Sequence, residues 1–480
     1  MADTETFSGT ADADGRHRLR RWQFGTAGIL TAGYGAFYLC RMNLSVAGAM
    51  PGFTPGIISE YEFGLLGTVG TLVYAFGKLL NGLTADFLGG RRLFLIGLFG
   101  AAGLTVGATL DPRVGVVLVA LAMVIFGAYV GGAMLVVGLV LACGFAFWFW
   151  PGSIFLSLLA FWMATRYVQS GGWPALVKVS SHWFDYHWHG SVMGVISLSY
   201  LVGDFLAKAY LGFFADNSDW RTIYYLAAGA TVLFALVPLF LLREKPVDLA
   251  LPEPLANPEN LYGEEGNVDR PAGFFDILGP FLRSLAFWMV LLMSFGLTFI
   301  RETLNYWLPH LLREVSGSPG RAILGAAVFP FGGAISVLAA GYLSDVVAGG
   351  NRARIILPGL VLATFSMMGL AFFGERQSYW VVVTLVGLSA VFLIGPYSFL
   401  AGVIALDLGG KHGSSTASGI IDSVGYAGGS VAGIGIAALL DIGENGQQMV
   451  FRALFGAALV SALAAAVYLW RMGGVRRESA

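Results

Sequence analysis

Runs of about 20 apolar residues recur along almost the whole chain, and they limit its fold more than any other feature. A helix needs roughly 20 apolar residues to cross the hydrocarbon core of a bilayer. Only 12% of the 480 residues are charged, about half the share in a soluble domain, and 14% are aromatic, too many for a disordered chain. We therefore predict an all-α polytopic membrane protein. The twelve predicted spans are 24–50, 62–85, 93–111, 153–177, 190–214, 222–242, 284–311, 321–343, 355–374, 379–405, 414–440 and 448–470.

A further uncharged region separates the third and fourth of these runs. Residues 114–150 number 37 and carry no charge, so one straight helix over them would be about 55 Å long, nearly twice the hydrocarbon thickness. The pair Gly131-Gly132 divides the region into two pieces, each just long enough to span. We expect an inserted transmembrane hairpin at 114–150 in the first half, and fourteen spans in total.

Several classes of protein are excluded by the residues that carry chemistry. The formal net charge of −1 gives no basic field for a nucleic-acid partner. The two cysteines, Cys40 and Cys143, lie in apolar runs, which predicts neither a disulfide framework nor a zinc site. No short apolar segment with a cleavage site follows the basic N-terminus, so we expect no signal peptide. The sequence has no phosphate-binding loop and no nucleophile–base pair, so we expect no ATP-driven transport, no enzyme and no cofactor.

The distribution of Lys and Arg predicts the orientation of the spans. Cytoplasmic connections carry an excess of these residues, and alternate connections such as Pro51–Glu60 and Asp441–Gln448 carry none. Every basic cluster falls on one side if both termini are cytoplasmic, which requires 114–150 to cross an even number of times. The basic clusters are Arg16–Arg21, Gly90–Arg92, Arg166–Lys178, Arg243–Lys245, Asn351–Arg354, Lys411-His412 and Arg476-Arg477.

Two matching halves flank a polar linker that is rich in proline. The second span of the first half ends in Gly82-Leu83-Thr84-Ala85-Asp86 … Gly90-Arg91-Arg92. The second half repeats this pattern as Gly341-Tyr342-Leu343-Ser344-Asp345 … Gly350-Asn351-Arg352. The duplicated turn resembles the loop motif of the major facilitator superfamily, which implies a major facilitator fold of two six-helix halves. The predicted divisions are a cytoplasmic tail at 1–22, a helical half at 23–242, a cytoplasmic linker at 243–283, a second half at 284–471 and a tail at 472–480.

We single out eight ionisable residues in or beside the predicted spans, because a charge inside a span costs about 2.5–3.5 kcal/mol and marks a candidate functional site. Arg41 and Arg301 each lie about 18 residues into the first span of their half. Both helices run the same way, so we expect the two guanidinium groups at similar depth, facing one central cavity. The eight residues are Arg41, Lys78, Asp204, Lys208, Arg301, Glu302, Asp407 and Asp422.

The helical neighbours of Arg41 favour an anion site. Tyr34, Tyr38 and Arg41 share one helix face, and Tyr74 and Lys78 are one turn apart. Arginine can bind a phosphate with two parallel hydrogen bonds, and lysine adds a point charge. Arginine, lysine and phenol groups together predict a receptor for a doubly charged oxyanion.

At these positions the chain resembles one family of transporters. The segment Gly33–Ser45 is similar to the first helix of the organophosphate:phosphate antiporters, the family of glycerol-3-phosphate and hexose-6-phosphate transporters. The similarity covers most of the chain, and Ser418–Asp422 also resembles the sugar-phosphate exchangers of animals. The other matching segments are Tyr74–Lys78, Gln169–Pro174, His182–Phe184, Arg301 with Trp307, Gly395-Pro396 and Gly425–Ser430.

The resemblance implies a function and a role for single residues. It implies alternating access, with inorganic phosphate exchanged for a phosphorylated small metabolite such as glycerol 3-phosphate or a sugar phosphate. Arg41 and Arg301 would hold the phosphoryl group. We expect a monomer in the lipid bilayer of a bacterial plasma membrane. The rest of the site would be formed by Lys78, Tyr34, Tyr38, Tyr74, Gln169 and Tyr426.

The chain departs from the glycerol-phosphate members of that family at several positions. Ser197 and Tyr200 stand where those members have an Asn and a His in the fifth helix. Pro330 replaces a Glu of the eighth helix, and Ile394 replaces a Tyr of the tenth. These departures leave the organic part of the substrate open.

The residues alone leave three alternatives open. In the first, each buried cation pairs with a carboxylate, such as Glu302 or Asp422, for structure only. In the second, the protein is a proton-coupled symporter of an organic anion, and Asp204, Asp422 or Glu302 carries the proton, with Lys208 one turn from Asp204 as a charge partner. In the third, the protein is a transporter-like sensor of a sugar phosphate.

The duplicated loops and a histidine-rich segment complete the candidate residues. His182, His187 and His189 are close enough in sequence for a metal site, but the resemblance implies an amphipathic cytoplasmic loop there, and we expect no metal. The loop charges are expected to gate transport or support the fold without touching substrate. They are Asp86, Arg91, Arg92, Asp345 and Arg352.

Overall fold

All regular structure among the described residues is helical, which confirms the predicted fold class. Eight helical segments in this part of the chain are long and apolar enough to cross a membrane. The hairpin predicted at 114–150 lies outside the described residues. The computed structural model describes residues 4–48, 50, 53, 56–110, 153–215, 217–258, 260–268, 273–316, 325–348, 351–373, 378–440, 442 and 445–478.

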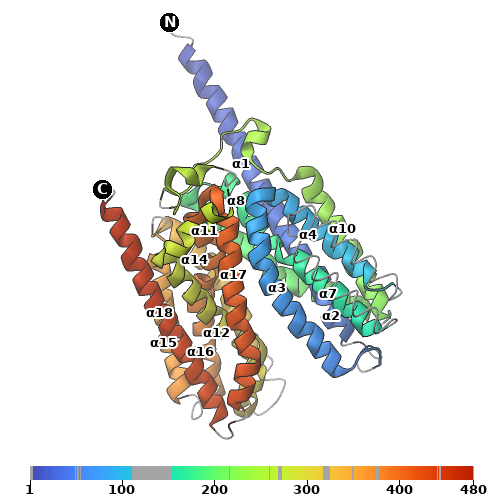
Figure 1. Cartoon of the computed structure of the whole chain (residues 1–480). Helices are drawn as coiled ribbons and strands as arrows, with labels where there is room; N and C mark the ends of the chain where they lie inside the picture. The colour runs from blue at the N-terminus through green and yellow to red at the C-terminus, as the bar shows by residue number, and fades with distance from the viewer. Residues whose placement is uncertain are drawn as a thin grey trace. The chain divides into compact units, whose positions relative to one another are not determined.

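The contacts divide the chain into two compact units, of which the first consists of Met1–Trp183 and Ser199–Pro254. Its helices are α1 (Thr4–Ala36), α2 (Leu39–Gly48), α3 (Glu60–Leu88), α4 (Gly90–Gly107), α7 (Ile154–Ser170), α8 (Gly172–Trp183), α10 (Trp220–Leu241), the part of α9 (His189–Ala215) from Ser199 onward, and the turn η2 (Pro246–Leu249). Helix α3 packs on α7, and both α7 and α10 pack on α4. Figure 1 shows these four helices side by side.

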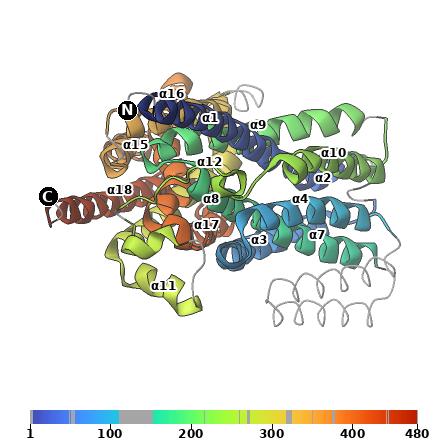
Figure 2. The same cartoon turned by 90° about the horizontal axis from the view of Figure 1, so that it is seen from above.

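The second unit consists of Phe184–Leu198 and Leu255–Ala480. It contains η1 (Tyr186–Trp188), the start of α9, η3 (Gly263–Asn267), α11 (Phe274–Arg283), α12 (Leu285–Ser316), α14 (Val328–Val346), α15 (Ala353–Phe373), α16 (Tyr379–Phe399), the π-helical turn η5 (Leu400–Ile404), α17 (Ala405–Leu440) and α18 (Gly446–Glu478). Helix α12 packs on α17 and α18, and α15 packs on α16 and α18. Figure 2 shows the helices of this unit from above.

Side-chain caps fix where several helices begin. At the start of α3, the Ser59 hydroxyl accepts from the amide of Glu62, whose carboxylate accepts from the amide of Ser59, so two otherwise unpaired donors are satisfied. Helix α10 begins after Asp219, whose carboxylate accepts from the amide of Thr222. The hydrogen bonds from Thr222 hold the pKa of the Asp219 carboxyl below its usual value. Gly89, at φ +93°, makes the sharp turn between α3 and α4.

Two predicted spans prove to be interrupted helices. The span predicted at 24–50 breaks between α1 and α2, and the span predicted at 153–177 breaks at Gly171 between α7 and α8. The ring of Phe37, at the first break, is fully buried between glycines: a Cβ added to Gly97 or Gly172 would lie 2.9 or 2.8 Å from it. Arg41 lies in the first turn of α2, directly after this break, and its side chain reaches Tyr74 of α3.

Helix α9 approaches one other helix in each unit through glycine. In the first unit a Cβ on Gly203 would lie 2.8 Å from the Cα of Gly35 in α1. In the second unit a Cβ on Gly341 of α14 would lie 2.6 Å from the carbonyl oxygen of Gly190. Small residues let the backbones of membrane helices meet this closely. Neither glycine pair therefore accepts a side chain without displacing a helix.

Candidate functional site

The phenol ring of Tyr74 is the centre of the predicted anion site in the first unit. Tyr74 and Lys78 lie one turn apart on α3 and are both almost completely buried. Arg41 of α2 donates a hydrogen bond of 3.0 Å from Nη2 to the Tyr74 hydroxyl, and its guanidinium carbon is 4.9 Å from the ring centroid. The Lys78 ammonium is 5.2 Å from the same centroid. Two predicted cations thus meet at one predicted tyrosine.

The two tyrosines of α1 and the following turn extend this cluster. Arg41 also stacks on Tyr38, 4.4 Å from the ring centroid. The Tyr38 ring makes an edge contact with Tyr34 at 6.2 Å, and Tyr34 in turn contacts the indole of Trp173 at 5.2 Å. The structure therefore brings Tyr34, Tyr38 and Arg41 together as predicted, but across the break between α1 and α2 and not on one continuous helix face.

A third cation, Arg166, belongs to this cluster and was missed by the sequence argument. Its guanidinium carbon lies 4.2 Å from the Tyr74 ring centroid, and Nη1 lies 3.5 Å from Oε1 of the buried predicted residue Gln169. The sequence argument counted Arg166 and Lys178 as charges of a cytoplasmic connection. Arg166 instead lies within α7, and both side chains are buried. The available signal was the spacing of Arg166 and Gln169, three residues apart and so on one helix face.

The second unit contains its own arginine–tyrosine pair. Arg301 of α12 stacks on Tyr397 of α16, with 4.8 Å between the guanidinium carbon and the ring centroid. It also forms an ion pair with its neighbour Glu302. Sequence reasoning identified Arg301 and Glu302 but missed Tyr397, which directly follows the quoted Gly395-Pro396.

Close packing of α12 on α17 positions the two remaining predicted residues of this unit. A Cβ on Gly425 would lie 2.7 Å from the hydroxyl oxygens of Ser294 and Thr298. Asp422 and Tyr426, both half-buried, lie within one turn of this approach on α17. Each unit is thus a separate scaffold for a tyrosine-supported arginine.

The predicted Asp204 and Lys208 form a different kind of pair. They lie one turn apart on α9, with 2.8 Å between the Asp204 carboxylate and the Lys208 ammonium. Their side chains are 35% and 52% exposed. An ion pair of this exposure contributes little to stability.

The first of the duplicated loops is fixed by buried charges. Asp86 and Lys178 form an ion pair of 3.2 Å, and neither side chain is exposed. The Glu244 carboxylate accepts from the amides of Gly90 and Arg91 at 2.8 and 2.7 Å, where the N-terminus of α4 favours negative charge. The Arg91 side chain donates to the carbonyl oxygens at the end of α10, whereas Arg92 is exposed.

The second loop carries a larger network, centred on Arg352. Its guanidinium pairs with Asp345 and Asp407 and donates to the carbonyl oxygen of Tyr186. Burial alone would lower the pKa of Arg352, but the two carboxylates outweigh it and hold that pKa above its usual value. Asp345 also accepts from the backbone amides of Gly190 and Ser191 at the start of α9. All these groups belong to the second unit.

The three histidines of the histidine-rich segment each have a separate carboxylate partner. These pairs are His182 with Glu253, His187 with Asp185 and His189 with Asp407. His189 is buried, and its second ring nitrogen lies 3.2 Å from the carbonyl oxygen of Phe184. Within the described residues no three His, Cys, Asp or Glu side chains cluster as metal ligands would.

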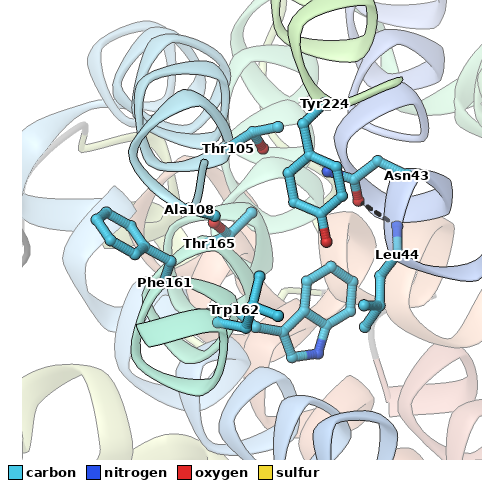
Figure 3. A pocket seen from close by; sticks show the side chains of 9 residues that line it. Asn43, Leu44, Thr105, Ala108, Phe161, Trp162, Thr165 and Tyr224 are labelled. Carbon is cyan, nitrogen blue, oxygen red and sulfur yellow. Dashed lines mark hydrogen bonds between the residues drawn. The ribbon is translucent and has the colours of Figure 1, made fainter. Parts of the chain in front are cut away.

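A small cavity lies beside the cation cluster in the first unit. Its volume is about 10 Å³, room for one water molecule and not for a phosphate ester. Figure 3 shows Asn43, Trp162 and Tyr224 around it. Arg166 connects the two regions, because its guanidinium lies 5.7 Å from the Trp162 ring as well as on Tyr74. The cavity therefore lies next to the cation cluster, and Trp162 separates it from Arg166.

Comparison with known proteins places this architecture in a family. Residues 129–433 match the model of the Major Facilitator Superfamily. A probable hexose phosphate transport protein of Chlamydia pneumoniae is 25% identical over 462 residues, 93% of this chain and 91% of that protein. The glycerol-3-phosphate transporter of Bacillus subtilis is 23% identical over 406 residues, 83% and 81% of the two chains.

A solved structure supports the fold independently. The transporter FucP in its outward conformation matches with a TM-score of 0.60 and 14% identity, covering 92% of this chain and 96% of that one. The names of the relatives confirm the predicted resemblance to organophosphate transporters. The matched model, the apolar helices and the shared fold lead to one conclusion: this chain is an integral membrane protein that belongs to the Major Facilitator Superfamily.

Proposed function

We propose that this protein is a secondary transporter that exchanges inorganic phosphate for a phosphorylated small metabolite by alternating access. The observation that carries the proposal is the meeting of Arg41 and Lys78 at the buried ring of Tyr74. Buried charges in membrane segments are costly and mark ion or substrate pathways. The relatives named for hexose phosphate and glycerol 3-phosphate supply the substrate class.

The chemistry of the two arginines fits a phosphoryl group. A guanidinium presents parallel N–H donors that match two phosphate oxygens. An aromatic ring stacked on its face fixes the orientation of the guanidinium and leaves these in-plane donors available for the phosphate. Arg41 has Tyr38 and Tyr74 as such supports, and Arg301 has Tyr397. In this proposal the ligand displaces Glu302 from its ion pair with Arg301. The protein then changes between its outward-facing and inward-facing states more readily with ligand bound than without it.

The loop networks suit a mechanism in which each unit moves as one body. The Asp86–Lys178 pair joins elements of the first unit, and the ion pairs of Arg352 with Asp345 and Asp407 join elements of the second. Such pairs persist while the units change their mutual orientation. We propose that they keep each unit rigid, so that ligand binding is coupled to movement of a whole unit.

Exchange of labelled phosphate tests the proposed function. Purified protein in liposomes loaded with unlabelled phosphate should take up labelled phosphate, and liposomes loaded with sulfate should take up far less. Phosphate esters added outside should compete. A protein that binds a phosphate ester yet moves no phosphate in either preparation would instead fit the sensor alternative.

Asp422→Asn separates antiport from proton symport. Asp422 lies one turn before Tyr426 on α17, and a carboxylate near cations can either pair with them or carry a proton. We expect phosphate exchange to remain measurable in Asp422→Asn with an altered affinity for phosphate, because the carboxylate serves as a displaceable partner. Asp276→Asn, which changes an exposed carboxylate outside the predicted spans, is the matched control. Loss of uptake driven by a pH gradient, with counterflow retained, would support symport instead.

We further propose that both termini are cytoplasmic in a bacterial plasma membrane and that the protein acts as a monomer. The turn of the predicted hairpin, at Gly131-Gly132, then faces the cytoplasm. A single cysteine there, in a variant with Cys40→Ser and Cys143→Ser, should react with an impermeant maleimide only in inverted membrane vesicles. Labelling from the outside of intact cells would contradict this topology.

A further inference from the structure

Arg166 was not predicted from the sequence as a site residue, and the proposed exchange of phosphate gives it no role. It is 8% exposed and lies on α7, within a predicted span. Its guanidinium carbon is 4.2 Å from the Tyr74 ring centroid, closer than the guanidinium carbon of Arg41 at 4.9 Å or the ammonium nitrogen of Lys78 at 5.2 Å. Three helices, α2, α3 and α7, thus each bring one cation to a single phenol ring.

Arg41 and Arg166 contact different parts of the Tyr74 ring. Arg41 donates to the hydroxyl oxygen of Tyr74, at one end of the phenol. Arg166 lies over the ring and continues to the indole of Trp162, 5.7 Å away. Stacking occupies the flat face of a guanidinium, whereas its hydrogen bonds leave in the plane. The Tyr74 ring therefore acts as a spacer between two points at which an anionic oxygen can be bound.

A purely structural role explains this arrangement less well. A neutral long side chain can stack on Tyr74 and Trp162 without the cost of a charge inside the membrane. Gln169, on the same face of α7, accepts from Arg166 Nη1 at 3.5 Å, so its amide oxygen helps to orient the guanidinium. A positioned charge at this depth is characteristic of a site that binds an anion.

We propose that Arg166 binds a second anionic group of the transported ester while Arg41 and Lys78 hold its phosphoryl group. This inference rests on the proposed function and narrows its substrate class. The preferred ligands are small phosphate esters that carry a carboxylate or a second phosphoryl group. An ester with only hydroxyl groups beyond its phosphate leaves Arg166 without a ligand oxygen.

A matched pair of ligands tests the role of Arg166. Glycerol 3-phosphate and 3-phosphoglycerate share a carbon skeleton and differ in a hydroxymethyl against a carboxylate group. In wild-type protein, 3-phosphoglycerate should inhibit exchange of labelled phosphate at about a tenfold lower concentration than glycerol 3-phosphate, the effect of one hydrogen bond to a charged group. Fructose 1,6-bisphosphate against fructose 6-phosphate distinguishes a second phosphoryl group from a carboxylate.

Substitution of Arg166 should remove this preference selectively. In Arg166→Gln, inhibition by 3-phosphoglycerate should weaken about tenfold to hundredfold, while inhibition by glycerol 3-phosphate stays within about threefold of wild type. Arg166→Lys, which keeps the charge, should retain part of the preference. Arg221→Gln is the control, because Arg221 also stacks on an indole, that of Trp220 at 4.6 Å, but is exposed.

The outcomes separate the role of Arg166 from the proposed function. Equal inhibition by both three-carbon esters in wild type, with phosphate exchange intact, overturns the role of Arg166 alone. An equal loss for both esters in Arg166→Gln also overturns it, because it shows a general effect on the site. Should that variant fail to accumulate, the wild-type comparison decides. Absence of phosphate exchange in wild type overturns the proposed function itself.

Discussion

Replacing Arg41 with lysine is expected to lower the rate of phosphate exchange by about a hundredfold while the protein still inserts into the membrane. Lysine keeps the charge but loses the planar pair of donors, and one or two hydrogen bonds to an anion, each of about 1.5–3 kcal/mol, are lost with it. It also loses the stacking on Tyr38 and Tyr74 that fixes the guanidinium. Initial rates of labelled phosphate uptake, normalised to inserted protein, measure the effect.

The same change at Arg301 should have a similar effect, because Arg301 is also stacked on a tyrosine, Tyr397. Arg221→Lys provides the matched control: its arginine is exposed and stacks on Trp220. We expect that variant to exchange phosphate at the wild-type rate. Full exchange in Arg41→Lys or Arg301→Lys would show that the arginine is structural and would leave the substrate site unassigned.

Replacing Arg352 with methionine is expected to destabilise the protein by about 3–5 kcal/mol, because it leaves buried carboxylates without their cation. Asp345 and Asp407 are 1% and 7% exposed in their side chains, and Arg352 pairs with both. Methionine keeps much of the volume, so the loss reports on charge. Unfolding in detergent, followed by tryptophan fluorescence against denaturant concentration, measures the change in the free energy of unfolding.

An exposed pair offers the control for this prediction. Lys208→Met breaks the ion pair with Asp204, whose carboxylate remains accessible to solvent, and should cost at most about 1 kcal/mol. Adding Asp345→Asn and Asp407→Asn to Arg352→Met should recover part of the stability, since neutral amides replace the unpaired charges. Equal free energies of unfolding for Arg352→Met and the wild type would show that the charge of Arg352 does not stabilise the protein.

The eight described segments that are long and apolar enough to cross a bilayer could be predicted, because a single physical requirement, apolar length, determines them. Every described helix that fulfils this requirement lies where a run was expected, from α3 at Glu60–Leu88 to α18 at Gly446–Glu478. Hydropathy carries no information on interruptions, so the breaks at Phe37 and Gly171 were not predicted. Both depend on how a buried ring or a helix end packs against its neighbours.

The candidate site was predicted where local spacing determines which side chains meet. Arg41, Tyr38 and Tyr34 lie within eight residues of one another and stay close across the break between α1 and α2, whereas Arg166 reaches Tyr74 from another helix, 92 residues along the chain. Lys178 directly follows the span predicted at 153–177, where a cation can be a loop charge or a buried one, but Arg166 lies near the middle of that span and was grouped with Lys178 as one basic cluster. Tertiary packing decides between the two, and it buries both Arg166 and Lys178.

The duplicated loop motif shows the same limit. The pattern predicts Asp86 and Asp345 as equivalent positions, but their partners differ. Asp86 pairs with Lys178, whereas Asp345 caps the amides of Gly190 and Ser191 and pairs with Arg352. Those partners are far away in sequence and follow no repeat. A motif predicts a position, and the surrounding helices determine what the residue at that position does.

Efflux of labelled phosphate from liposomes loaded with it tests the central claim most directly. With no pH gradient and no membrane potential, glucose 6-phosphate or 3-phosphoglycerate added outside should release the label, and ester uptake should equal phosphate loss in amount. Efflux into buffer free of phosphate and ester should be slow, and Arg41→Lys should slow the ester-driven release about a hundredfold. Ester uptake that needs a pH gradient and proceeds without phosphate loss would contradict phosphate exchange as the function of this protein.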